Sequence, residues 1–203
     1  MRRTALLAAF GLAISLVAGP SALAVDADEF TITGLKPADP QPGDGAMKPG
    51  LAVTYYSNKF NHVDEIFDWA EYRNGRPGEP IPILDYHVGE GDVLTSGKQN
   101  LVGAMIEGYI NFPEPGVYAF VVESNDGVLV EIAGELILLD PDVHFDRFSE
   151  ISTVQIDEAG WYDLFVVYFE KKSTSTLRLF WNKPGEEGEM AIIPAEQYAH
   201  VPE

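Results

Sequence analysis

A succession of short apolar segments, separated by turns that carry glycine or proline, restricts the fold of this sequence most strongly. The clearest lie at 104–112, 117–123 and 161–169. In the second of these, Tyr118 and Phe120 share one face while their neighbours share the other. Further segments of this kind lie at 51–57, 83–88, 128–132, 135–139, 152–156 and 176–181. Strands at this spacing are typical of an antiparallel β-sandwich or barrel, so the sequence predicts an all-β fold.

One segment departs from this pattern. Val63, Ile66 and Phe67 stand at helical spacing within residues 63–69, which is enough for one or two helical turns. We therefore expect an all-β, antiparallel sandwich or barrel with one or two short helical turns.

The N-terminus has the features of an export signal. Arg2 and Arg3 precede an apolar run from 5 to 19, and Ala22 and Ala24 supply the small residues that a signal peptidase reads. The alternative is a membrane anchor, but a span needs about 20 apolar residues and this run is shorter. The sequence predicts a signal peptide at 1–24 and a secreted, periplasmic or cell-surface protein. No later run is long enough to span, so no membrane insertion of the mature chain is expected.

A leader rich in proline, glycine and aspartate follows at 25–49. Such a composition holds little regular structure, so we expect it to run over the surface or to be mobile. Within it, residues 30–33 could add one edge strand. A single β domain is predicted over 50–203.

The charge balance limits the partners. The chain has a net charge of −19, and removal of 1–24, which contain two arginines and no acid, makes it −21. Nucleic acid and anionic membranes would repel such a surface, whereas cations, neutral sugars or a basic protein partner would not. Adaptation to a salty exterior is an alternative explanation of the acidity. There is no cysteine, which excludes disulfides, thiolate metal sites and cysteine nucleophiles.

Several short motifs, in a fixed order, resemble the PA-fourteen domain, which is named from the anthrax toxin protective antigen. They are Gly50-Leu51 with Tyr55-Tyr56, Gly108-Tyr109-Ile110, Pro115-Gly116-Val117-Tyr118-Ala119-Phe120, Ser124-Asn125-Asp126-Gly127-Val128, Ala159-Gly160-Trp161-Tyr162, Val167-Tyr168-Phe169-Glu170, Leu177 to Trp181, and Ile193-Pro194. No single motif is specific, but the ordered set covers about 50–199. The resemblance implies a β-sandwich or barrel module of the kind found in bacterial glycosidases, fungal adhesins and toxins, which in many members binds carbohydrate.

The resemblance also implies a calcium site. In the sugar-binding branch, two consecutive aspartates joined by a cis peptide and a second loop hold one calcium ion, and sugar hydroxyls complete its shell. Asn125 and Asp126 fall on the aspartate pair, and Glu170 falls on the second-loop ligand, an asparagine in the adhesins. Lys171 and Ser173 would lie in the loop that contacts the sugar. Asn125 in place of the first aspartate, and Ala133 in place of an aspartate found in many members, depart from the family pattern.

The chemistry of these residues is compatible with calcium, which takes roughly six to eight oxygen ligands. Asp126 and Glu170 would supply two carboxylates, Asn125 a neutral oxygen, and loop carbonyls the rest. The plain alternative is that Ser124 to Gly127 form a turn, because Asn, Asp and Gly all favour turns. Likewise, residues 170–175 could be a solvated hairpin loop, and a lysine near a metal would be mildly unfavourable.

Several other polar and aromatic residues are compatible either with a binding role or with a structural one. Asp140, Asp142 and Asp146 lack the spacing of a helix–loop–helix calcium loop, so a solvated loop is expected there. The four histidines lie far apart, which argues against zinc. Trp69 and Tyr72, near an irregular loop, are candidates for an exposed platform on which a sugar ring stacks, with burial as the alternative.

Nothing in the sequence marks an active site. No serine elbow, HExxH motif or phosphate loop is present, and no acid pair stands out among the 32 acids. The predicted function is therefore that of a secreted, non-catalytic carbohydrate-binding module that uses calcium to bind a glycan or polysaccharide. The alternative is a metal-independent structural or protein-interaction module.

Overall fold

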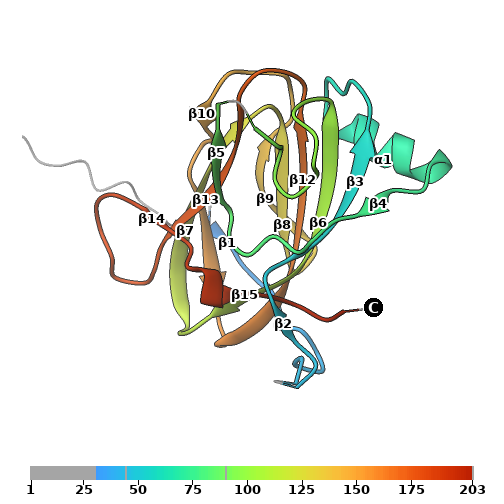
Figure 1. The fold of residues 1–203 in the computed structure, drawn as a ribbon. Coiled ribbons are helices and arrows are strands. Elements are labelled where there is room, and N and C mark those ends of the chain that lie inside the picture. The colour runs from blue at the N-terminus through green and yellow to red at the C-terminus, as the bar shows by residue number, and fades with distance from the viewer. Residues whose placement is uncertain (1–30, 44, 90, 203) are drawn as a thin grey trace, which may run out of the picture.

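Two β-sheets packed face to face form the protein, as the ribbon in Figure 1 shows. The computed structural model describes residues 31–43, 45–89 and 91–202. The predicted signal peptide and the first residues of the leader lie outside these ranges. Because the two sheets stay separate, the fold is a sandwich, and the all-β prediction is confirmed.

The first sheet, sheet A, has seven strands: β1 (Thr31–Ile32), β5 (Asp85–Val88), β7 (Gly116–Asn125), β10 (Arg147–Phe148), β11 (Ser152–Ile156), β13 (Ser175–Asn182) and β14 (Ala191–Ile192). Its main path runs β1-β11-β7-β13-β14, with β10 paired to β7 and β5 paired to β13. Within the described ranges, β1 with β11 is the one parallel pair.

The second sheet, sheet B, has eight strands: β2 (Lys48–Pro49), β3 (Ala52–Ser57), β4 (Arg76–Pro77), β6 (Val102–Phe112), β8 (Val128–Ile132), β9 (Glu135–Asp140), β12 (Gly160–Glu170) and β15 (Tyr198–His200). Its path runs β2-β15-β6-β12-β8-β9, and β3 and β4 extend from β6. At its centre, β6 and β12 pair over eleven residues, from Gly160 opposite Phe112 to Glu170 opposite Val102. Glu170 therefore stands at the end of this long ladder.

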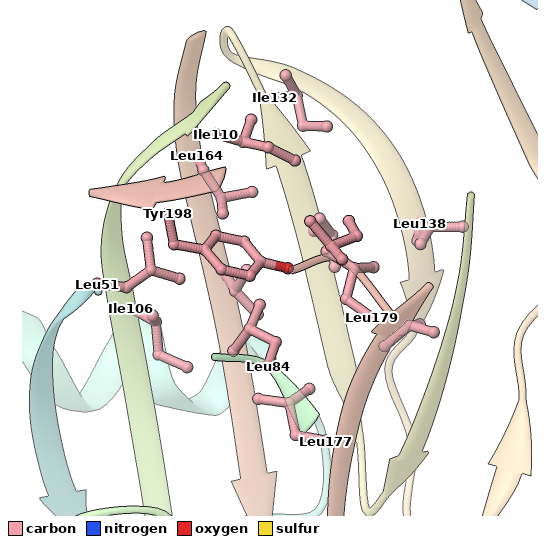
Figure 2. Packing of buried hydrophobic residues seen from close by; sticks show 14 of the residues in the cluster. Leu51, Leu84, Ile106, Ile110, Ile132, Leu138, Leu164, Leu177, Leu179 and Tyr198 are labelled. Atoms are coloured by element: carbon pink, nitrogen blue, oxygen red, sulfur yellow. The ribbon is translucent and has the colours of Figure 1, made fainter. Parts of the chain in front are cut away.

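The core lies between the two sheets and follows from the alternation in the strands. Tyr118, Phe120 and Val122 of β7 all point inward and are buried, as the alternation predicts. Figure 2 shows the ring of Tyr198 entering from β15, with its hydroxyl directed into the space between the sheets. Leu177 and Leu179 of β13 line the same interior from sheet A.

A second, smaller cluster lies on the outer face of sheet B beneath the helix α1 (Asp64–Tyr72). Its buried members are Phe60, Val63, Ile66, Leu129, Val167 and Phe169. The predicted helical turns at 63–69 thus exist, and the helix covers a patch of the sheet that would otherwise face water. A 3₁₀ turn at Ala195–Gln197 is the other helical element of the described chain.

The described part of the leader has little regular structure, as its composition predicts, but it is anchored to the domain. Leu35 is buried in the main core, and the backbone N–H of Ala38 donates to the carbonyl of Trp161 at 2.9 Å. The side chain of Gln41 accepts from the N–H of Trp161 at 2.8 Å and donates to its carbonyl at 2.9 Å. The leader therefore packs on the sandwich from β1 onward.

In the chain outside residues 1–30, 44, 90 and 203, no helix has the length and apolar character that a membrane crossing requires.

Candidate calcium- and sugar-binding site

Two loop tips meet at one end of the sandwich, and each connects one sheet with the other: β7 of sheet A leads into β8 of sheet B, and β12 of sheet B leads into β13 of sheet A. β7 ends at Asn125, a cis peptide leads to Asp126, and β8 begins after Gly127. The backbone N–H of Asp126 donates to the carbonyl of Phe169 at 3.0 Å, and the N–H of Phe169 donates to the carbonyl of Gly127 at 3.0 Å. These bonds place Asp126 beside the end of β12, where Glu170 follows Phe169. The two candidate carboxylates thus come together at one end of the molecule.

Gly127 permits this approach. A Cβ at its position would lie 2.5 Å from a ring carbon of Phe169 and 2.5 Å from the carbonyl oxygen of Pro141. Any larger residue would push the tip away from β12. The glycine is therefore required by close packing of the tip.

Asp126 is buried, with 3% of its surface exposed. Its Oδ2 accepts from the backbone N–H of Lys171 at 2.8 Å. Burial raises the pKa of Asp126 above its ordinary value, and the backbone N–H groups of Lys171 and His144 oppose this shift. This tip is therefore buried, because the second loop and residues 141–144 cover it.

Glu170 is fully buried at 0% exposure. Its Oε2 accepts from the backbone N–H of Leu101 at 3.1 Å, whereas Oε1 has no hydrogen-bond partner among the described residues. Burial, and then the negative charge of Asp126, raise the pKa of Glu170 to about 7. A buried carboxylate oxygen without a partner, beside a second carboxylate, is an arrangement that a bound cation would stabilise.

Asn125 completes the group of candidate ligands at 4% exposure. Its Nδ2 donates to Thr174 Oγ1 at 2.7 Å, and its backbone carbonyl accepts from the hydroxyl of Tyr168 at 2.6 Å. The amide nitrogen is thus held by the second loop, which leaves Oδ1 as the atom that could ligate a cation.

Lys171 takes part in this site through its backbone. Its Nζ donates to Asn61 Oδ1 at 2.8 Å, and among the described residues no ion pair within 4 Å joins it to Asp126 or Glu170. The ammonium group is therefore satisfied without entering the carboxylate pair.

Ser173 lies at the rim of an open cavity of about 550 Å³. The lining residues are Gly91, Gln99, Asn100, Lys172 and Ser173. The backbone N–H of Ser173 donates to Asn100 Oδ1 at 2.8 Å, and the next residue, Leu101, holds Glu170. Residues 99–101 therefore connect the cavity with the buried carboxylates. Sequence reasoning missed them, and only their polar character at Gln99 and Asn100 could have drawn attention to them.

The segment after β9, for which the sequence predicts a solvated loop, also lies beside the site. The side chain of Asp140 is mostly buried and pairs with Arg147, whose Nε lies 2.7 Å from Asp140 Oδ2, and this pairing lowers the pKa of Asp140. His144, whose side chain is 5% exposed, places Nε2 at 3.3 Å from the same oxygen. The expectation of a solvated loop at Asp140–Asp146 is therefore wrong for Asp140 and His144, which support the tip that carries Asp126.

Trp69 and Tyr72 lie on α1. Among the described residues, no contact joins either of them to the candidate ligands Asn125, Asp126 and Glu170. Trp69 packs edge-on against Phe60 at 6.5 Å between ring centroids, and the guanidinium of Arg73 lies 5.5 Å from its ring. It helps to hold α1 on the sheet. Tyr72 is 79% exposed at the last residue of the helix.

The donor set fits a hard cation better than a transition metal. Within the described ranges, no three His, Asp or Glu side chains gather in a metal-binding arrangement. Two carboxylates and an amide oxygen, supplemented by backbone carbonyls, are instead the oxygen donors that calcium takes.

A family model described as the PA14 domain matches residues 47–192. The chain belongs to the PA14 domain family. No curated protein matches the sequence.

Solved structures share the PA14 fold at low sequence identity. A PA14 sugar-binding domain from an RTX adhesin has a TM-score of 0.60 at 17% identity, covering 75% of this chain and 98% of that one. The Epa9 adhesin A domain from Candida glabrata, solved with Galb1-4GlcNAc, has a TM-score of 0.61 at 12% identity, covering 85% and 96%.

A third similar structure is an anti-sigma factor domain-containing protein, with a TM-score of 0.61 at 18% identity. The match covers 74% of this chain and 48% of that protein, so this chain spans about half of the length of the anti-sigma factor domain-containing protein.

Proposed function

We propose that this PA14 domain is an exported, non-catalytic carbohydrate-binding module in which a calcium ion bridges the protein and a glycan. The observation that carries the proposal is the meeting of Asp126 and Glu170 at neighbouring strand ends, where one oxygen of Glu170 has no hydrogen-bond partner among the residues that the structure describes. The sugar-binding structures with the same fold support it.

Calcium would offset the electrostatic cost of two buried carboxylates in one place. Asp126, Glu170 and Oδ1 of Asn125 would hold it, and carbonyls of the second loop would fill further positions. When bound, calcium supplies open coordination positions that vicinal sugar hydroxyls can occupy.

The glycan would lie over the ion and extend into the cavity beside it. Ser173 and Asn100 border that cavity, and Lys172 adds a donor at its wall. The side chains of Gln99, Asn100, Lys172 and Ser173 give this cavity polar walls, which suit a hydroxyl-rich ligand. Tyr72, which is exposed on α1, stays a candidate stacking platform for a longer chain.

The protein would act outside the cytoplasm, in the medium, the periplasm or at the cell surface. This rests on the predicted signal peptide at 1–24. Binding without catalysis is proposed because no acid pair in the sequence has the features of a glycosidase site. A metal-independent interaction module is the alternative function.

Calorimetric titration of the mature chain with CaCl₂, followed by a glycan array with calcium or with EDTA, tests this function. We expect calcium binding and a glycan signal that EDTA removes. Asp126→Asn and Glu170→Gln keep the side-chain volume, and each should weaken calcium binding at least tenfold. Asp157→Asn, which removes an exposed charge elsewhere, should not. Absence of calcium heat together with absence of any glycan signal would refute the proposal.

A further inference from the structure

The outer face of sheet A carries an open groove that is separate from the proposed calcium site. Its volume is about 380 Å³, and its lining includes Val121, Phe148, Ile151, Phe180 and Met190. Val121 of β7 faces away from the core, because side chains alternate along a strand and both of its neighbours are core residues. Phe180 of β13 stands directly opposite it. We call this hollow the apolar groove.

The apolar side chains of the groove are open to solvent. Phe148 is 57% exposed and Ile151 is 64% exposed. The two helical elements of the described chain pack on the other sheet, α1 against β3 and the 3₁₀ turn against β6. Figure 1 shows the loop of residues 183–190 projecting beside β7 and β14, at the border of the groove. Exposed apolar side chains that gather in one hollow mark an interaction surface.

The backbone holds these side chains in place. In β10, Phe148 pairs with Glu123 of β7. The N–H of Ser149 donates to the carbonyl of Val122 at 2.8 Å, and its Oγ accepts from the N–H of Val122 at 3.2 Å. The ring of Phe148 packs against that of Phe180 at 5.7 Å between centroids. A partner would therefore meet a surface that is already ordered, which lowers the entropic cost of binding.

Acidic residues border this apolar floor. Glu189 belongs to the lining, Glu150 directly precedes Ile151, and Glu187 lies in the bordering loop. Within the described ranges, none of the ion pairs shorter than 4 Å involves these three glutamates. The groove thus combines an apolar floor with a negatively charged rim.

Two cations near the groove are already paired. The guanidinium of Arg178 lies 5.0 Å from the ring of Phe180 and forms ion pairs of 2.8 and 2.9 Å with carboxylates of β5 and β7. In the bordering loop, Nζ of Lys183 lies 3.1 Å from a carboxylate oxygen of Glu186. Neither cation offsets the charge of the rim glutamates.

The combination of floor and rim selects the occupant. A second copy of this chain would bring a net charge of −19 toward the same negative rim, so electrostatic repulsion opposes it. A sugar would cover the phenyl rings and leave its hydroxyl groups short of polar partners. A peptide with apolar side chains on one side and lysine or arginine beside them complements both parts of the surface.

We propose that the apolar groove docks an amphipathic basic segment of a partner protein. Its apolar side chains lie between Phe148, Ile151 and Phe180, and its cations face Glu150, Glu187 and Glu189. The interaction needs neither calcium nor the glycan site.

The test uses the mature chain in 0.15 M NaCl with EDTA, the peptide acetyl-KLLKKLLK-amide as the probe, and ¹H–¹⁵N NMR. We expect shift changes confined to β10, to Ile151 and to the outer-face residues of β7 and β13. Neither acetyl-KSSKKSSK-amide, which lacks the apolar side chains, nor acetyl-ELLEELLE-amide, which reverses the charge, should produce them. Equal changes with either control peptide, or changes centred elsewhere, would overturn the proposal.

Matched double variants locate the apolar contact. Phe148→Ser with Ile151→Ser should weaken binding of acetyl-KLLKKLLK-amide at least tenfold. The control, Leu136→Ser with Leu139→Ser, changes side chains of β9 that are 46% and 49% exposed and should weaken binding less than threefold. Circular dichroism verifies that both proteins are folded. Equal losses of affinity would contradict docking in the groove.

A triple variant tests the rim. Glu150→Gln, Glu187→Gln and Glu189→Gln together should weaken peptide binding at least fivefold. The combination of Asp68→Asn, Glu71→Gln and Glu135→Gln removes the same charge from exposed positions on α1 and sheet B, and should weaken binding less than twofold. Losses of equal size would show that net charge alone attracts the peptide and would overturn the proposal.

Sedimentation velocity separates a partner protein from a second copy. We expect the chain alone to be monomeric in 0.15 M and in 1 M NaCl, where salt screens the repulsion. A dimer that Phe148→Ser dissociates would make a second copy the occupant of the groove and would overturn the proposal.

Discussion

Glu170 is the residue at which burial and charge oppose each other most strongly. It is fully buried, one of its oxygens has no partner in the described chain, and its pKa is raised to about 7 by burial and by Asp126. In the calcium-free protein this acid therefore keeps its proton to a higher pH than an ordinary glutamate does. The carboxylate is retained at a cost to stability that a ligated cation would remove.

This shift predicts a pH dependence of stability for the metal-free protein. Because the folded pKa of Glu170 lies above the ordinary value of 4.5, the folded state holds the proton more tightly. The proton on Glu170 therefore adds to the free energy of unfolding. This contribution is fully present below about pH 4.5 and is lost as the pH rises through about 7, which lowers the free energy of unfolding by up to about 3 kcal/mol. Urea unfolding in EDTA at pH 5 and pH 8 measures it. Glu170→Gln should lose less stability over this interval than the wild type, and identical losses would contradict the prediction.

Two buried tyrosines allow a paired test of hydrogen bonding. The hydroxyl of Tyr198 has no partner among the described residues, whereas that of Tyr168 donates to the carbonyl of Asn125 at 2.6 Å. Tyr198→Phe should leave the free energy of unfolding unchanged or raise it by about 1 kcal/mol. Tyr168→Phe should lower it by about 1–2 kcal/mol, because the carbonyl of Asn125 loses its donor. Denaturant titration checks both, and a strongly destabilised Tyr198→Phe would show that its hydroxyl is satisfied.

At the scale of elements, the loop tip between β7 and β8 depends on its approach to β12. Backbone hydrogen bonds between the tip and Phe169 fix the register, and Gly127 leaves the space for it. The tip is thus part of the packed structure, although its sequence is that of an ordinary turn.

Gly127→Ala should disturb this tip. The added Cβ would meet the ring of Phe169 and the backbone of Pro141 at 2.5 Å, so we expect a loss of about 1–3 kcal/mol from overpacking. Gly89→Ala, where no atom lies within 4 Å of the added Cβ, is the control and should change stability by less than about 0.5 kcal/mol. Thermal unfolding of the two variants compares them, and equal melting temperatures would refute the packing argument.

The attachment of α1 to sheet B rests on a few buried side chains. Ile66 is the helix residue with 0% exposure and lies in the cluster with Phe60 and Phe169. Ile66→Ala should cost about 2–4 kcal/mol through lost burial and the cavity left behind. Tyr72→Ala, at an exposed position of the same helix, should cost less than about 0.5 kcal/mol. Denaturation followed by circular dichroism measures both, and a small loss for Ile66→Ala would mean that α1 is held elsewhere.

For the whole molecule, the proposed calcium site should couple to global stability. A ligand that binds only the folded state stabilises it by about 2.7 kcal/mol at a free concentration 100 times its Kd. Adding CaCl₂ at that ratio should therefore raise the melting temperature of the wild type, and raise that of Asp126→Asn clearly less, because this variant binds calcium at least tenfold more weakly. An equal rise in both proteins would place the effect on the general acidity of the surface.

The strand pattern was predictable because side-chain alternation and Gly- or Pro-bearing turns are local features. The segments at 128–132 and 152–156 match β8 and β11, and 161–169 matches the interior of β12. The helix at 63–69 was visible for the same reason, since Val63, Ile66 and Phe67 mark one helical face. The candidate ligands Asn125, Asp126 and Glu170 came from an ordered set of motifs.

The tertiary structure alone decided which distant residues meet. It showed two open sheets instead of a closed barrel. It buried Asp126, where the local sequence predicts a turn, and Asp140, where it predicts a solvated loop. It brought the N–H of Leu101 to Glu170, and it paired Glu107 and Glu131 of two different strands with the same residue of β12, Phe165. A sequence specifies alternation and turns through interactions between neighbours. Burial, pairing and charge proximity depend on strands that are far apart along the chain, and they exist only after the sheets have formed.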